Sequence, residues 1–210
     1  MLILIRHGES AANVDADNSD GKYNKLTEKG TEQAKAIKPV LDKYFTIDHV
    51  FTSPATRCVK TAELCCSKPA AILDDIYELS SGLTDGVKIS DWVNIPRVGK
   101  ELNKLYQVYK DKPMLDTIFD KQTVAISKRL SKLAKSEGEY PKRLKRALLL
   151  AKSYTDRGKT VLFVTHGGVV NAYINVMFSM GRGASGKTPN CSISVIDMKK
   201  YKLLLNKYTI

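Results

Sequence analysis

Short apolar runs alternate with segments of helical pattern along the whole chain. The apolar runs predict five buried strands, at residues 2–5, 49–52, 70–73, 161–164 and 193–196. Strands that alternate with helices are typical of a mostly parallel central sheet with helices on both faces, so we predict a three-layer α/β fold. No repeat or low-complexity linker interrupts the chain, and residues 1–210 are therefore predicted to form a single domain.

Three predicted helices flank these strands. The first has an apolar face around Ile37, and Pro39 is expected to kink or shorten it. Ser53, which precedes a proline, predicts an N-cap and a helix that runs to about Cys66. A further helix is predicted at residues 168–180.

Residues 87–159 are mostly helical in pattern and strongly basic. They contain 18 Lys and Arg against 8 Asp and Glu, whereas the rest of the chain contains 16 against 14. Most of the net charge of +12 at pH 7 therefore belongs to one predicted helical lid insertion. A charged helical face is usually only solvated, but it can also attract a polyanionic substrate, and the sequence leaves both interpretations open.

Three features bear on where the protein resides. The uncharged stretch 160–181 contains His166 and Asn171, which would be costly in lipid, so it predicts a buried strand and helix instead of a membrane span. The apolar run at residues 1–5 is too short for the core of a signal peptide. Four cysteines without a C-x-x-C pair predict reduced thiols, so we expect a cytoplasmic protein with no membrane partner.

Candidate chemistry lies where the predicted strands end. The residues concerned follow the first, second and fourth strands: Arg6, His7, Ser53, Arg57 and His166. Because the carboxyl ends of parallel strands meet at one edge of a sheet, these side chains are expected to gather there. Guanidinium groups and helix N-termini bind phosphate oxygens, so this edge predicts a phosphate pocket with a histidine as the reacting group. His49 precedes a strand instead and is expected to be structural.

Five blocks extend these candidates along nearly the whole chain. They are R-H-G-E-S-A-A-N from Arg6 to Asn13, L-T-E-K-G from Leu26 with Gln33-Ala34 after it, S-P-A-T-R from Ser53 to Arg57 with Thr61-Ala62 after it, Glu78 with Gly82 and Gly86, and H-G-G from His166. In this order they resemble the signatures of the histidine phosphatase superfamily, in its phosphoglycerate-mutase-like branch. The resemblance is weakest between Gly86 and Val161, within the basic insertion.

The resemblance implies a reaction through a phosphohistidine, without a metal or a cofactor. His7 would attack phosphorus, and the like charge of two neighbouring guanidinium groups should favour its neutral, nucleophilic form. The phosphoryl oxygens would be held by Arg6, Arg57 and His166, with Asn13 and the Gly167 amide completing the pocket.

Glu78 is the residue that the resemblance implies as proton donor to the leaving oxygen and then as base for the attacking water. Three nearby carboxylates are rivals for this role: Asp74, Asp75 and Asp85.

The implied activity is hydrolysis of a phosphomonoester, either a small phosphorylated metabolite or a phosphoprotein. Phosphoglycerate mutase-type phosphoryl transfer is the alternative within the family. Glycolytic mutases of this family carry a tryptophan just before the signature asparagine and an arginine just after the acid glutamate. This sequence has Ala12 and Leu79 at those positions, which favours a phosphatase.

Other classes of function fit the sequence less well. The basic charge is compatible with a nucleic-acid-binding module, but no aromatic platform accompanies it, so no nucleic-acid partner is expected. A non-catalytic scaffold is disfavoured because all five catalytic positions are filled. Residues 181–188 fit G-x-x-x-x-G-K-[ST], yet they follow a helical pattern and precede Pro189, the reverse of the strand–loop–helix order of a P-loop. We expect this segment to be a loop at the rim of the pocket.

Overall fold

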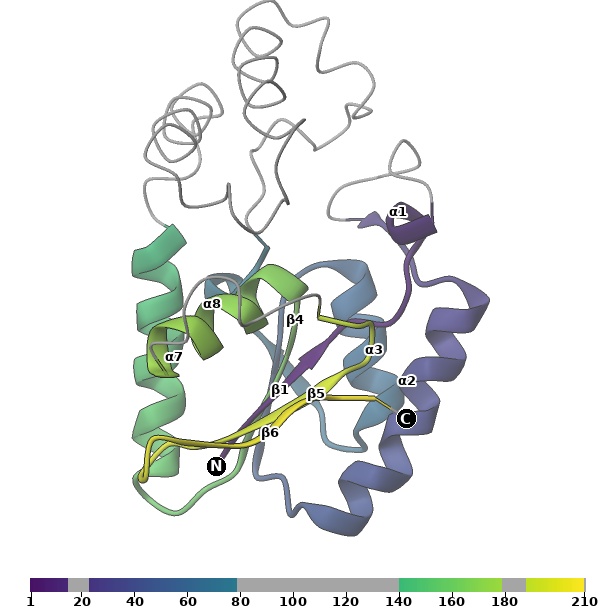
Figure 1. Cartoon of the computed structure of the whole chain (residues 1–210). Helices are drawn as coiled ribbons and strands as arrows, with labels where there is room; N and C mark the ends of the chain where they lie inside the picture. Colours follow the sequence, from purple (N-terminus) through teal and green to yellow (C-terminus); the bar gives the residue numbers. More distant parts are fainter. Residues whose placement is uncertain (15–22, 79–139, 179–187, 210) are drawn as a thin grey trace, which may run out of the picture.

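The computed structural model describes residues 1–14, 23–78, 140–178 and 188–209 (Figure 1). The strands are β1 (Leu2–Arg6), β2 (His49–Thr52), β3 (Ala70–Ile72), β4 (Val161–Thr165), β5 (Ile193–Asp197) and β6 (Lys202–Tyr208). The helices are α1 (Ala11–Val14), α2 (Glu28–Tyr44), α3 (Thr56–Cys65), the 3₁₀ turn η2 (Asp74–Ile76), α7 (Tyr140–Thr155) and α8 (Gly167–Phe178).

The strands form one sheet in the order β3-β2-β4-β1-β5-β6. The first four strands in this order pair in parallel, and β5 and β6 add an antiparallel edge. The predicted α/β fold with a mostly parallel sheet is thus confirmed, and all five predicted strands are present. The sequence did not predict β6, whose residues alternate between exposed and half-buried.

Helices cover both faces of the sheet, as Figure 1 shows, with α2 and α3 on one face and α7 and α8 on the other. The strand β1 supplies both cores because its side chains alternate between the faces. Ile3 and Ile5 pack with α2 and α3, whereas Leu2 and Leu4 pack with α7 and α8. A strand buried on both faces explains why its sequence is continuously apolar.

Two predicted helix ends differ from the structure, while a kink at Pro39, the other effect expected of the proline, stays a prediction. Helix α2 is not shortened at Pro39 but continues to Tyr44, because Ile37 and Leu41 on either side of the exposed proline are anchored in the core. Ser53 is not an N-cap, since α3 begins at Thr56 and Ala55 takes the cap position without a side-chain hydrogen bond. The Ser53 hydroxyl is used elsewhere, as described below.

The basic insertion lies largely outside the described residues, so the two interpretations of its charge stay predictions. Its last part is helix α7, which confirms the helical pattern there. Residues 181–187 of the P-loop-like segment also lie outside the described part, and Thr188 after them is buried and donates to Asn171 Oδ1 over 2.7 Å. Among the described residues, no helix is long and apolar enough to span a membrane.

The loop after β1 lies against the start of α2 without room for a side chain. A Cβ atom on Gly8 would lie 2.4 Å from the Gly30 carbonyl oxygen, and one on Gly30 would lie 1.9 Å from that of Glu9. Both positions therefore require glycine, which lets the backbone segments approach this closely. This contact fixes the loop that follows His7.

Candidate active site at the carboxyl edge of the sheet

The two histidines that follow β1 and β4 lie together in the structure. His7 and His166 are both buried, and their ring centroids are 5.3 Å apart in an edge-on arrangement. The pairing of β1 with β4 explains this. The two strands are parallel neighbours, and Arg6 pairs with Thr165, so the residues that follow them, His7 and His166, lie side by side. The sheet therefore brings together residues that are 159 positions apart in the sequence.

The tautomer of His7 follows from its partners. Its Nδ1 lies 2.7 Å from the Gly8 carbonyl oxygen, which can only accept, so Nδ1 carries the proton. Its Nε2 accepts from the Arg57 Nε group over 3.2 Å. The lone pair of Nε2 is therefore available for bonding, which is what a nucleophilic imidazole needs.

Arg57 connects the two histidines from the first turn of α3. While its Nε donates to His7, its Nη2 lies 3.2 Å from Nδ1 of His166 and donates to it. The other nitrogen of His166, Nε2, lies 2.8 Å from the Ser53 hydroxyl and donates to it. One planar guanidinium thus fixes both rings in their neutral forms, a task that suits its rigid fork of donors.

Burial and nearby cations hold both histidines neutral. The pKa of His7 is well below 6.5, first because the ring is buried and then because Arg57 and Arg6 repel a second positive charge, while the hydrogen bond to Gly8 opposes the shift. The pKa of His166 is also well below 6.5, with burial again the first cause, followed by His7 and Arg57. The sequence predicted the effect of the guanidinium groups, but burial is the larger cause.

Arg6 and Gly167 lie side by side. The Arg6 Nη1 donates to the Thr188 carbonyl oxygen over 2.5 Å. A Cβ atom on Gly167 would lie 3.5 Å from the Arg6 Cδ and Nε atoms, so the first turn of α8 packs directly on the Arg6 side chain. Burial lowers the pKa of Arg6, while the charge of Glu78 raises it.

Glu78, the expected acid, lies at the N-terminus of α8. Its Oε2 accepts from the Gly168 amide over 3.4 Å, and its Oε1 would be only 2.4 Å from a Cβ atom on Gly168. Of the three rival carboxylates, Asp75 pairs with Arg146, Asp74 is exposed, and Asp85 lies outside the described residues. Glu78 is thus the carboxylate that the structure brings to the end of β4.

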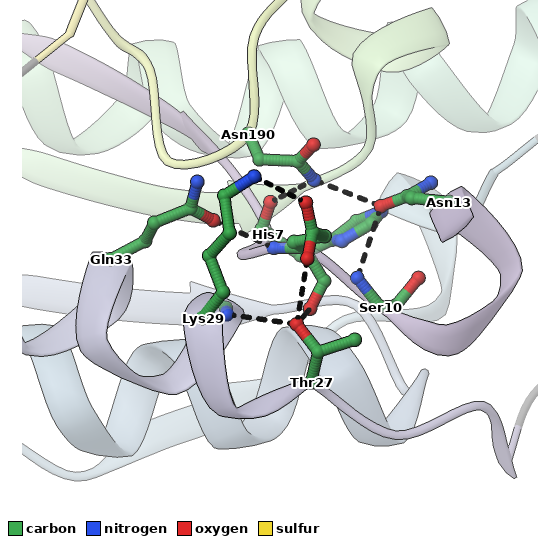
Figure 2. A network of polar contacts seen from close by, with 9 residues as sticks. His7, Ser10, Asn13, Thr27, Lys29, Gln33 and Asn190 are labelled. Carbon is green, nitrogen blue, oxygen red and sulfur yellow. Dashed lines mark hydrogen bonds and ion pairs between the residues drawn. The ribbon is translucent and has the colours of Figure 1, made fainter.

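Asn13 belongs to a polar network that contacts the backbone of His7 and the loop after it (Figure 2). Its Oδ1 accepts from the Ser10 amide over 3.2 Å and from Asn190 Nδ2 over 2.9 Å. The same Asn190 group donates to the His7 carbonyl oxygen over 3.0 Å. In this structure Asn13 therefore ties the loop after β1 to the segment before β5.

The lower half of the same network in Figure 2 fastens this loop to α2. Thr27 caps α2 by accepting from the Gly30 amide over 3.0 Å, and its hydroxyl donates to Glu9 Oε1, also over 3.0 Å. Glu9 further pairs with Lys29 over 2.9 Å, and its amide donates to Gln33 Oε1. Thr27 and Lys29 of the L-T-E-K-G block therefore hold the loop that follows His7 against the start of α2.

Comparison with known proteins agrees with this geometry. The family model described as "Histidine phosphatase superfamily (branch 1)" matches residues 2–210. The chain belongs to the histidine phosphatase superfamily. A 2,3-bisphosphoglycerate-dependent phosphoglycerate mutase of Thermoplasma acidophilum is 27% identical over 212 residues, covering 97% of this chain and 90% of the relative.

Other similarities of this superfamily member cover less sequence or show the fold alone. A phosphoglycerate mutase of Haemophilus influenzae is 42% identical over 64 residues, which is 30% of this chain but only 28% of that mutase. The crystal structure of a putative α-ribazole-5′-P phosphatase from Escherichia coli superposes with a TM-score of 0.70 at 21% identity, covering 100% of this chain and 95% of that one. The fold is thus shared by mutases and phosphatases.

Several residues contact the site in ways that the sequence analysis did not assign, including Ser53, which was predicted as an N-cap. Ser53 holds His166, and Thr61 accepts from the Gly8 amide over 3.1 Å. Both lie in the S-P-x-x-R-x-x-x-T-A block, which was the available signal. Cys58 packs with its sulfur 3.5 Å from His166 Nε2, and burial raises the pKa of its thiol to about 12. Asn190 begins a stretch that resembles the last strand of the family, but no signal in the sequence pointed to Cys58 as a member of the site.

His49 packs away from the described site residues, as expected of a structural histidine. It lies at the start of β2, and its ring centroid is 4.1 Å from that of Tyr154. All four cysteines are buried free thiols. Within the described ranges, no three His, Cys, Asp or Glu residues cluster as metal ligands would.

The neutral histidines predict a pH dependence of stability. An unfolded histidine takes up a proton near pH 6.5, whereas folded His7 and His166 do so only at lower pH. The unfolded state then binds more protons, so the free energy of unfolding falls as the pH drops below about 6.5, by up to about 1.4 kcal/mol per pH unit for each histidine. Urea unfolding of the wild type and His7→Asn between about pH 7 and 5 measures this slope. The variant should lose less stability per pH unit, and equal slopes would contradict the prediction.

Proposed function

We propose that the protein hydrolyses phosphomonoesters through a phosphohistidine at His7. The observation that carries the proposal is the pairing of Arg57 with His7 Nε2 and His166 Nδ1, which presents a neutral imidazole beside a guanidinium. A phosphoryl group that displaces these contacts would meet the nucleophile and its electrostatic partner together.

The first step of the proposed reaction uses both sides of the pocket. His7 Nε2 forms a bond to phosphorus while the bond from phosphorus to the ester oxygen breaks, and Glu78 gives its proton to that oxygen. Arg6, Arg57 and His166 bind the equatorial oxygens of the phosphoryl group. Positive charge from the two arginines takes the place of a metal, so the proposed reaction needs none.

The second step reverses the role of Glu78. Its carboxylate takes a proton from water as the water oxygen attacks phosphorus, the nitrogen–phosphorus bond breaks, and inorganic phosphate leaves. Neutral His7 and protonated Glu78 are restored. Placement of the Glu78 carboxylate beside the Gly168 amide, at the N-terminus of α8 next to His166, supports both roles.

Mutase-type transfer is the second candidate, because a phosphoglycerate mutase is 42% identical over 64 residues and another is 27% identical over 212 residues. Ala12 and Leu79 favour hydrolysis, since they replace the tryptophan and arginine of the glycolytic mutases. The proposed substrates are small phosphorylated metabolites or phosphoproteins, and neither a nucleic acid nor a membrane is proposed as a partner.

One pair of assays separates the two candidates. Phosphate release from p-nitrophenyl phosphate, phosphorylated metabolites and phosphopeptides measures hydrolysis, and interconversion of 2- and 3-phosphoglycerate with the bisphosphate present measures mutase activity. We expect phosphate release, with interconversion slower than hydrolysis of the best ester. Interconversion that is faster than any hydrolysis would make the protein a mutase, and the absence of both activities would overturn the assignment.

A further inference from the structure

Side chains of helix α7 form hydrogen bonds with the turn η2, which leads to Glu78. Arg146 donates twice to Asp75, from Nε to Oδ2 over 3.1 Å and from Nη2 to Oδ1 over 2.7 Å. One turn earlier on α7, Arg143 Nη1 donates to the Asp74 carbonyl oxygen over 3.1 Å. Two arginines of one helix thus hold two successive residues of η2, and the contact with Asp75 is a two-pronged one that fixes orientation as well as distance.

The other end of η2 is fastened to the sheet. Thr165, the last residue of β4, donates its hydroxyl proton to the Ile76 carbonyl oxygen over 2.6 Å, and the Ile76 side chain is fully buried. The next residue, Tyr77, meets the His166 ring edge-on, with the centroids 5.6 Å apart. The backbone from Asp74 to Tyr77 is therefore held between α7 and the site, and Glu78 follows it directly.

The Glu78 carboxylate itself has a long contact on the α8 side. Its 3.4 Å distance to the Gly168 amide is beyond the usual range of an N–H···O hydrogen bond, so this contact orients the carboxylate weakly. Gly168 lies in the first turn of α8, two residues after His166, so this contact lies beside the phosphate pocket. Because Glu78 directly follows the fastened residues 74–77, the position of η2 helps to set where the acid lies.

We propose that Asp75 and Arg146 are a positioning pair that aligns Glu78 for protonation of the leaving oxygen. The proposal rests on the proposed function, since it assigns the acid step to Glu78. The Arg146 side chain is 53% exposed and that of Asp75 21%, so the pair is partly open to solvent, and its two-pronged contact fixes the orientation of η2. Its effect on the reaction should appear in the step that depends on a well-placed proton donor.

The measurement is how kcat/KM changes with the basicity of the leaving group. A role in stability alone would not alter this dependence. Nitrophenolate leaves without a proton, whereas a more basic phenolate needs the acid. The variants Asp75→Asn and Arg146→Gln are assayed on aryl phosphates from p-nitrophenyl to p-methylphenyl phosphate. We expect kcat/KM to fall by about tenfold for p-methylphenyl phosphate and by less than about twofold for p-nitrophenyl phosphate.

The control and the double variant complete the test. Lys152→Gln removes an ion pair between the last turn of α7 and Asp156, just after the helix and away from η2, and should leave the whole series unchanged. Asp75→Asn with Arg146→Gln should be no worse than either single change, because both remove one interaction.

Equal losses for every ester, no loss for any, or additive losses in the double variant would overturn the positioning role. Arg146→Lys keeps the charge but not the two-pronged contact, so it tests the same interaction if a neutral variant folds poorly. A wild type that hydrolyses none of the esters would instead overturn the proposed function, which keeps the two failures distinguishable.

Discussion

The variant His7→Asn is expected to lose at least about 10⁴-fold in kcat/KM for p-nitrophenyl phosphate, because the amide has no lone pair that can attack phosphorus. Two contacts prepare the imidazole for the proposed role, since its Nδ1 proton is donated to the Gly8 carbonyl and its unprotonated Nε2 lies beside Arg57. Asparagine is small enough to occupy the buried site, so a loss of activity would not need a loss of fold.

A phosphoenzyme trap tests the same prediction directly. Wild type mixed with ³²P-labelled ester and quenched in alkali should retain label, which acid should then release, as expected of a nitrogen–phosphorus bond. His7→Asn should retain none. The control is His49→Asn, which changes the structural histidine at the other end of β2 and should keep both label and turnover. Label on the His7→Asn chain would place the nucleophile elsewhere.

The variant Arg57→Lys is expected to lower kcat by about 10²- to 10³-fold although it keeps the positive charge. A lysine ammonium is a point charge at the end of a flexible chain, and it cannot reproduce the planar pair of donors that reaches His7 Nε2 and His166 Nδ1, each at 3.2 Å. In Arg57→Lys the positive charge beside the phosphoryl group is kept, but the alignment of both imidazole rings with that group is lost.

The matched control for Arg57→Lys is Arg157→Lys. Arg157 donates to the Ser153 carbonyl oxygen at the end of α7 and lies over the Tyr154 ring, outside the pocket. Steady-state kinetics of both variants should show full activity for Arg157→Lys only. A kcat for Arg57→Lys within about tenfold of wild type would mean that charge, and not the shape of the guanidinium, is what the site requires.

Much of this site could be predicted from the sequence because its chemistry lies at strand ends. The apolar runs predict where β1, β2 and β4 stop, and parallel pairing then requires His7, His166 and the turn before Arg57 to share one edge. The structure brings these groups together as expected, with Glu78 beside α8. Asn13 lies in the network behind His7, where it links Ser10 to Asn190.

Other features could not be predicted because they depend on contacts between distant segments. Ser53 fits an N-cap locally, but its hydroxyl is taken by His166, which lies 113 positions further along the chain. Pro39 should shorten a helix in isolation, yet packing on both sides of it keeps α2 continuous. The strand β6 has only three successive apolar residues, Leu203 to Leu205, with polar residues on both sides, and as an edge strand it alternates between exposed and half-buried positions.

The sequence by itself determined the family, the fold class and the residue types of the site, because the positions of the strands and the chemistry at their ends follow from local patterns of apolar, glycine and charged residues. Only the tertiary structure decided how those residues act. Burial is what chiefly keeps both histidines neutral, and burial is a property of the packed chain. The ion pair of Arg146 with Asp75 likewise joins residues 71 positions apart. No local pattern in the sequence indicates which arginine of a basic helix pairs with which carboxylate of a distant turn.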